Sequence, residues 1–201
     1  LAEALRARVF ADIDNWTRAG LALVPVSINA APVEFMRDNY AERLLRQLEK
    51  AGIAPSRIEL EVTEQTLDER GSLLVIRALH ILRKAGIRVA LDDFGTGHSS
   101  LTRLRDFPVD CLKIDSNMVG NFGRDPAITA VVNAIGQIGP ALSLELVAEG
   151  IETPEQCQML AAAGFKIGQG HLFSKAVNAQ SIAQMLAPAS SEALKAQTQL
   201  A

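Results

Sequence analysis

The chain has 201 residues, of which 48% are hydrophobic, so it is long enough to form one domain with a substantial core. Its 20 basic and 23 acidic side chains nearly balance, which argues against the clustered positive charge that duplex nucleic acid requires. The sequence contains no apolar run near the ~18 residues of a membrane helix, and its charged first residues are unlike a signal peptide, so no membrane contact is predicted for this segment.

Helix-like and strand-like patterns alternate along the chain. Apolar residues at helical spacing predict helices, and glycines such as Gly20, Gly86 and Gly164 are expected to end them. The expected helices cover 1–19, a segment with Leu44, Leu45 and Leu48 that closes at Gly52, 73–84, 126–138, 154–163 and 179–186. The expected strands cover 21–29, 57–64, 87–95, 110–115, 142–150 and 165–170.

This regular alternation predicts a mostly parallel α/β sheet. Two folds fit the pattern, an open doubly wound sheet and a (β/α)₈ barrel, and a barrel needs eight strands in about 250 residues. A barrel would therefore lack two strands at its start. We expect the barrel domain to occupy residues 1–187, with residues 188–201 as a tail or linker.

Polar residues follow the apolar part of every expected strand. In chain order they are Asn29, Glu61 and Glu64, Asp92 and Asp93, Lys113 and Asp115, Glu149 and Glu152, and Gln169. Parallel strands place their carboxyl ends on one face, where converging carboxylates repel one another unless cations neutralise them. Oxygen ligands of this kind suit Mg²⁺ or Mn²⁺, and two such ions can activate water against a phosphodiester.

Simpler interpretations exist for each residue taken alone. Asn29 suits a turn, Glu149 and Glu152 suit the first turn of a helix, and Lys113 could face outward from its strand. The glycine-rich loop 91–101 suits close backbone approach, but it matches neither the Walker A pattern nor GxGxxG. Its spacing alone leaves its purpose open.

Six ordered motifs then carry a resemblance. DDFGTGHSSL, beginning at Asp92, resembles the signature loop of EAL-domain cyclic di-GMP phosphodiesterases. VSIN (26–29), ELEVTE (59–64), LKID (112–115), VAEGIET (147–153) and GQGHLF (168–173) also match motifs of that family in its order. The resemblance implies a (β/α)₈ barrel whose first two strands, with the namesake Glu-Ala-Leu segment, are not in this chain. The EAL tripeptides at 3–5 and 192–194 are coincidental, because they lie in a helix and in the tail.

The resemblance also implies roles for the residues at the strand ends. Asn29, Glu61 and Asp92 are implied to bind a first metal ion, and Asp93 and Glu149 a second, with Mg²⁺ or Mn²⁺ in both positions. The implied catalytic residues are Lys113, which holds or deprotonates the attacking water, Glu64, which anchors the glycine-rich loop, Glu149 and Glu152. Gln169 and Asp115 are implied to contact the substrate.

The implied reaction opens one phosphodiester bond of cyclic di-GMP to give linear pGpG. A catalytically inactive cyclic di-GMP receptor or interaction module is the alternative, and a Mg²⁺-dependent barrel enzyme that uses Lys113 to deprotonate a carbon acid is a third candidate. The resemblance further implies a homodimer and sensory or GGDEF-type domains upstream. Because the two cysteines suggest no disulfide framework, we expect a cytoplasmic domain, free or within a membrane-anchored protein.

Overall fold

The computed structural model describes residues 2–36, 39–68, 72–95, 104–105 and 107–187. The strands are β1 (Val26–Asn29), β2 (Ile58–Thr63), β3 (Arg88–Phe94), β4 (Cys111–Ile114), β5 (Glu145–Ala148) and β6 (Ile167–Gly168). The helices are α1 (Ala2–Arg18), α2 (Pro32–Phe35), α3 (Tyr40–Lys50), α4 (Glu64–Asp68), α5 (Ser72–Lys84), α6 (Ser116–Asn121), α7 (Pro126–Ala141), α8 (Pro154–Ala162) and α9 (Ala179–Leu186), with a 3₁₀ turn at Pro55–Arg57.

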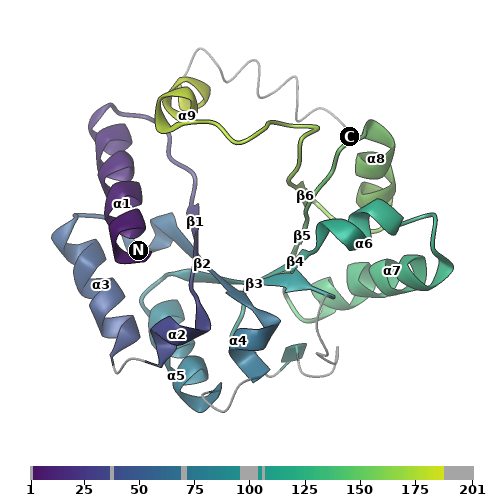
Figure 1. Cartoon of the computed structure of the whole chain (residues 1–201), viewed down its shortest axis with the longest axis horizontal. Coiled ribbons are helices and arrows are strands. Elements are labelled where there is room, and N and C mark those ends of the chain that lie inside the picture. Colours follow the sequence, from purple (N-terminus) through teal and green to yellow (C-terminus); the bar gives the residue numbers. More distant parts are fainter. Residues whose placement is uncertain (1, 37–38, 69–71, 96–103, 106, 188–201) are drawn as a thin grey trace.

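The six strands form one parallel sheet in sequence order, from β1 to β6. A doubly wound sheet reverses its strand order part-way, whereas a barrel does not. Figure 1 shows the sheet curled into an open trough with α3, α5, α7 and α8 on its convex side. The structure therefore confirms the expected barrel-type α/β fold, with six of the eight strands of a closed barrel present.

Alternation along each strand separates an apolar face from a polar one. Leu60, Leu91, Leu112 and Ile114 point toward the helices and are at most 1% exposed. Burial of an aliphatic side chain of this size stabilises the fold by about 1.5–3 kcal/mol. Because strand side chains alternate with a period of two, the residues between these point into the trough.

Local signals place several helix ends where the sequence predicts them, although α7 runs to Ala141 and not to residue 138. Thr153 and Gln156 form a capping box at the start of α8, and the Asp125 side chain accepts hydrogen bonds from the first turn of α7. Gly20 follows α1 with φ 71°, a conformation that glycine adopts without strain.

The predicted first strand was too long. Only Val26–Asn29 of the segment 21–29 pairs with β2. Pro25 has no N–H for the ladder, and the Leu23 carbonyl accepts from the Arg57 guanidinium instead of from a strand. The strands expected at 142–150 and 165–170 are likewise shorter, at Glu145–Ala148 and Ile167–Gly168. The short helices α2, α4 and α6 were not predicted, because each is too short for a periodic apolar pattern to emerge.

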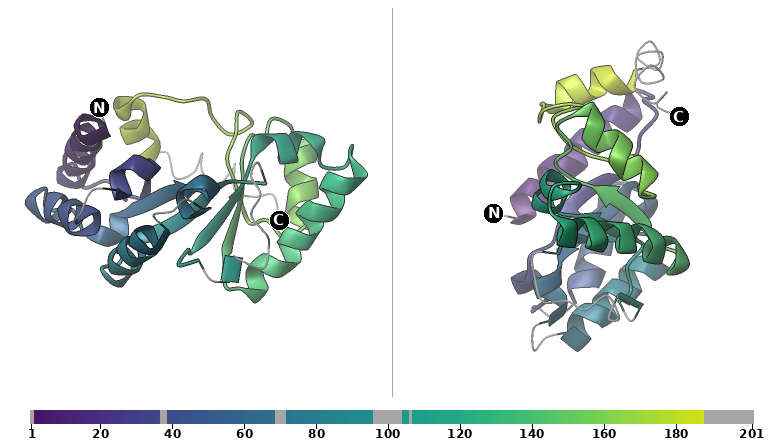
Figure 2. Two further views of the ribbon diagram at one scale, coloured as in Figure 1. Left: turned by 60° about the horizontal axis from the view of Figure 1, so that its bottom comes forward. Right: turned by 90° about the vertical axis from the view of Figure 1, so that its right-hand side faces the viewer.

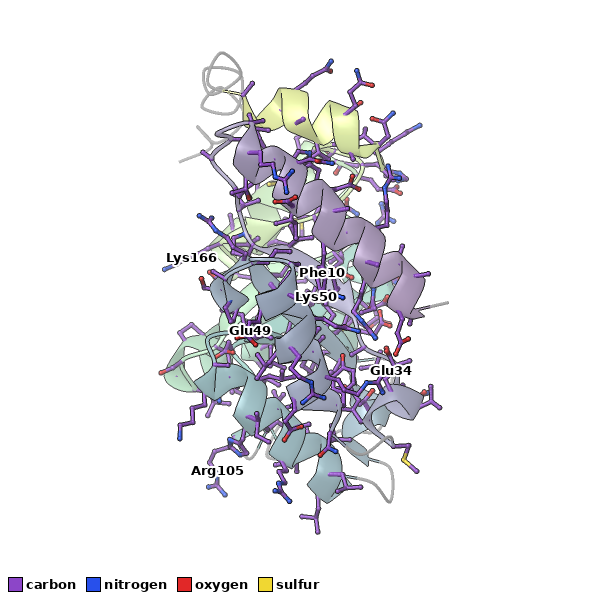
Figure 3. The ribbon with its side chains drawn as sticks, turned by 90° about the vertical axis from the view of Figure 1, so that its left-hand side faces the viewer. Phe10, Glu34, Glu49, Lys50, Arg105 and Lys166 are labelled. Carbon is purple, nitrogen blue, oxygen red and sulfur yellow. The ribbon has the colours of Figure 1, made fainter. Side chains whose placement is uncertain are left out.

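The two ends of the described chain meet across the open side of the trough. After β6 the chain crosses that side to α9, which lies beside α1 in Figures 1 and 2. There the Trp16 indole N–H donates to the Ala179 carbonyl at 3.2 Å. Figure 3 shows the outer face of α1 and α3, with Phe10 and Lys50 at the seam between these helices, where both line one groove.

Candidate metal and catalytic site

The polar residues of the trough lie at the carboxyl ends of its strands. Asn29 pairs in register with Glu61 on the neighbouring strand, which places both at the same level of the sheet. Lys113 on β4 and Glu149, directly after β5, approach from the other side, and the Lys113 side chain reaches Glu61. Parallel strands bring these residues together although up to 120 positions separate them in the sequence.

Asp92 and Asp93 face the site through an irregularity in β3. The pairing of β3 with β4 shifts register between Leu91 and Phe94, and Asp93 has a left-handed φ of 54°. In a regular strand two adjacent side chains point to opposite faces. The bulge breaks that rule and turns both carboxylates toward one rim, and aspartate is among the few residues that tolerate the left-handed region.

Lys113 is the centre of the site. Its Nζ lies 2.5 Å from Glu61 Oε1, 2.6 Å from Glu149 Oε1 and 3.2 Å from Asp92 Oδ1. Lys113 is 5% exposed and Glu61 is 8% exposed, so this is a buried cluster. The lysine therefore points into the trough, and the alternative that it faces outward is wrong.

The electrostatics of the cluster favour an ammonium group. Burial by itself lowers the pKa of Lys113, but hydrogen bonds to Glu149 and Glu61 and the charges of these carboxylates outweigh it and raise the pKa. Burial also raises the pKa of Glu149, an effect that the lysine opposes. The pKa of Asp93 is raised by burial and by the nearby charges of Asp92 and Asp115.

The carboxylates form a donor set that fits a divalent metal ion. Asp92, Asp93 and Glu149 each offer an oxygen, and these oxygens lie within 4.8 Å of one another. The Asp92 Oδ1 atom is buried and makes no hydrogen bond, although Nζ of Lys113 lies 3.2 Å away. A buried carboxylate oxygen without a hydrogen bond is unfavourable, and a hard cation such as Mg²⁺ or Mn²⁺ would satisfy it.

Glu64 connects the site to the glycine-rich loop. It is the first residue of α4, is 4% exposed, and accepts a hydrogen bond from the Gly95 N–H at 3.2 Å. The Gly95 φ of 100° suits glycine alone among the residue types. The remainder of the loop, including Gly97, Ser99 and Ser100, lies outside the described residues.

Besides Asn29, Glu64 and Asp93, three of the predicted residues lie outside the ion-pair cluster around Lys113. Asp115 caps α6 by accepting from the Asn117 N–H at 2.8 Å. The Glu152 and Gln169 side chains are exposed near the start of α8 and after β6. The roles of these three residues as catalytic or substrate contacts stay predictions.

A second charged layer, beneath the first, was missed at the sequence level. Arg88 forms ion pairs with Glu59, at 3.3 Å, and with Glu145, and Ser27 donates to Glu59 at 2.9 Å. The sequence does contain a signal for this layer. Glu59 precedes Glu61 by two residues and Glu145 precedes Glu149 by four, and residues an even number apart in a strand face the same side of the sheet. A small apolar cluster that includes Cys111 separates the two layers, and burial raises the pKa of the Cys111 thiol to about 12.

Comparison with known proteins decides the family. The EAL domain family matches residues 1–176. The chain belongs to the EAL domain family. Cyclic di-GMP phosphodiesterase NbdA of Pseudomonas aeruginosa is 34% identical to it over 168 residues, which are 84% of this chain and 21% of NbdA.

Solved EAL domains share its fold. The EAL domain of Mycobacterium smegmatis DcpA superposes with a TM-score of 0.81 at 32% identity, covering 88% of this chain and 79% of that one. Klebsiella pneumoniae BlrP1, in a manganese and cyclic di-GMP complex, superposes with a TM-score of 0.76 at 30% identity, covering 85% of this chain and 43% of that one. This EAL chain spans about a fifth of the length of the curated relatives it matches.

Proposed function

We propose that this chain carries a two-metal phosphodiesterase site that opens one phosphodiester bond of cyclic di-GMP to give linear pGpG. The observation that carries the proposal is the cluster of four carboxylates, Glu61, Asp92, Asp93 and Glu149, gathered around Lys113 at the carboxyl ends of the strands. The name of NbdA and the ligands of the BlrP1 complex support the same substrate and the use of divalent ions.

The proposed metal ligands divide into two sets. Asn29, Glu61 and Asp92 would hold the first ion, and Asp93 and Glu149 would hold the second. Bound there, two divalent ions lower the pKa of a water molecule and offset the charge of the phosphate. Mn²⁺ is supported by the BlrP1 complex, and Mg²⁺ is proposed because the ligands are all oxygen atoms.

The side chains around the ions would orient the reacting groups. Lys113 supplies a buried positive charge beside the attacking water, and three N–H donors with which to hold it. Glu64 holds the backbone of the glycine-rich loop through Gly95. Glu152 and Gln169 are proposed to position water or substrate at the exposed rim, and Asp115 to contact substrate in addition to capping α6.

The setting of the domain is also a proposal. The small share of its relatives that the chain covers supports further sensory or GGDEF-type domains in the same protein. Within the described residues no helix has the length and apolar character to cross a bilayer. We propose that the domain works in the cytoplasm, as a homodimer, on a soluble nucleotide.

The test is hydrolysis of cyclic di-GMP by the full-length protein with Mg²⁺ or Mn²⁺, beside a Glu61→Ala variant and an exposed control, Glu49→Ala. We expect metal-dependent release of pGpG that the Glu61 variant loses and the Glu49 variant keeps. Tight binding of cyclic di-GMP without turnover by the unsubstituted protein would instead identify a receptor. Hydrolysis that survives in Glu61→Ala would refute the proposed metal site.

A further inference from the structure

Lys113 occupies the position between the carboxylates where a cation is needed. Its ammonium group lies within 3.2 Å of oxygens from Glu61, Asp92 and Glu149, and the side chain is 5% exposed. All three carboxylates are also among the proposed metal ligands. The same carboxylate groups therefore have two candidate partners, a resident ammonium group and a divalent ion.

The two cations repel each other strongly when they share a carboxylate group. When both cations bind the same oxygen, a metal–oxygen distance of ~2.1 Å and an ammonium–oxygen distance of about 2.6 Å place them at most about 4.7 Å apart. Even with the screening of bulk water, repulsion between a divalent ion and a unit charge at that distance changes a binding constant by on the order of tenfold or more. The buried setting of Lys113 weakens the screening and increases the repulsion.

We propose that Lys113 is a resident counter-ion that a divalent metal must displace from Glu61. Before metal binds, the ammonium group neutralises part of the carboxylate charge and holds Glu61 and Glu149 in position. When metal binds, the lysine gives up Glu61 and stays beside the site, because β4 fixes its backbone while its four-carbon stem allows the head group to move. This inference rests on the proposed two-metal site and adds that the lysine lowers the metal affinity of that site.

The experiment is a calorimetric titration of the full-length protein with Mn²⁺ alone, without nucleotide. Lys113→Met removes the charge and keeps a side chain of similar length, and Lys166→Met removes an exposed lysine as the control. We expect Lys113→Met to bind Mn²⁺ at least about tenfold more tightly than the unsubstituted protein, and Lys166→Met to bind it equally. Equal or weaker binding by Lys113→Met overturns the inference.

A second variant and a crystal structure keep the inference testable if Lys113→Met fails to fold. Lys113→Gln keeps hydrogen-bond donors for Glu61 and Glu149 without the charge, and it should also bind Mn²⁺ more tightly. Circular dichroism checks that each variant is folded. In a crystal structure of the Mn²⁺-loaded protein, Nζ of Lys113 should lie beyond hydrogen-bond distance of Glu61, and a retained contact with the ion in place overturns the inference.

Hydrolysis of cyclic di-GMP by the unsubstituted protein, measured in the same buffer, separates the two proposals. Turnover together with unchanged Mn²⁺ affinity in the Lys113 variants refutes the counter-ion and leaves the phosphodiesterase intact. Tighter Mn²⁺ binding by the variants without any turnover refutes the phosphodiesterase and leaves the counter-ion intact. Failure of every form to bind Mn²⁺ overturns both.

Discussion

Replacing Asp93 by asparagine should stabilise the metal-free protein while weakening its affinity for metal. Asp93 lies near the like charges of Asp92 and Asp115, which raise its pKa after the contribution of burial, and its φ of 54° is one that asparagine also tolerates. The substitution therefore removes charge repulsion without adding backbone strain. It also removes one of three oxygen donors that lie within 4.8 Å of one another.

The magnitude follows from the separation of the charges. Two like charges at 4.8 Å, the upper limit for the facing oxygens of Asp92 and Asp93, repel by about 1 kcal/mol in water, and the exposure of Asp93 makes water-like screening appropriate. The attraction of Asp93 to Lys113 offsets part of this repulsion. We therefore expect the free energy of unfolding to rise by about 0.5 kcal/mol, which raises Tm by roughly 1–2 °C for a chain of this length.

Thermal unfolding in EDTA and in Mn²⁺ measures both effects. In EDTA at pH 7, Asp93→Asn should melt above the unsubstituted protein, and added Mn²⁺ should raise its Tm less. A carboxyl group with a raised pKa weakens the fold only when ionised, so the difference in EDTA should shrink as the pH falls toward 3.8, the ordinary pKa of an aspartate. Asp12→Asn, which removes one i,i+4 ion pair with Arg8 on α1, is the control and should change Tm little.

A lower Tm for Asp93→Asn in EDTA would show that the carboxylate makes a net favourable contribution to the fold. An undiminished Mn²⁺ effect would show that Asp93 is not a ligand. Either result refutes the reasoning, and the two failures can be told apart because each appears in a different buffer.

Two further substitutions test the framework beneath the site. Gly136→Ala would place a methyl group 1.8 Å from a carbonyl oxygen at the end of α8, so urea unfolding should show a loss of about 2 kcal/mol. In Gly120→Ala, within α6, the new methyl group meets nothing within 4 Å, so the substitution should stabilise the fold by about 0.5–1 kcal/mol. A similar effect at both positions would contradict the close packing of α7 and α8. Arg88→Met leaves two glutamates of the lower layer without their ion-pair partner. In urea unfolding at pH 7 the free energy of unfolding should fall by about 1 kcal/mol after allowance for exposure. The surface control Arg18→Met should lower it by at most about 0.5 kcal/mol. A loss no larger than that of the control would show that the lower layer contributes nothing to stability.

Much of the fold could be predicted from the sequence because its signals are local. The alternation of strands and helices, the glycines that end helices such as Gly20, and the period-two pattern around Leu60 and Leu112 depend only on nearby residues. The short helices, and the late start of β1 at Val26, could not be predicted in this way. A helix of four to six residues offers too few positions for a periodic pattern, and the carbonyl of Leu23 is satisfied by an arginine 34 residues away.

The candidate site could also be predicted only in part from the sequence. The sequence by itself determined which residue types stand at the strand ends, and hence that carboxylates and one lysine would meet at one rim. Only the tertiary structure decided how they meet. Curling of the sheet brings Lys113 onto Glu61, 52 residues away, and a shift of register in β3 turns both Asp92 and Asp93 to the same side. The physical reason is that strand curvature, bulges and register are set by the packing of the whole sheet, whereas side-chain chemistry is set residue by residue.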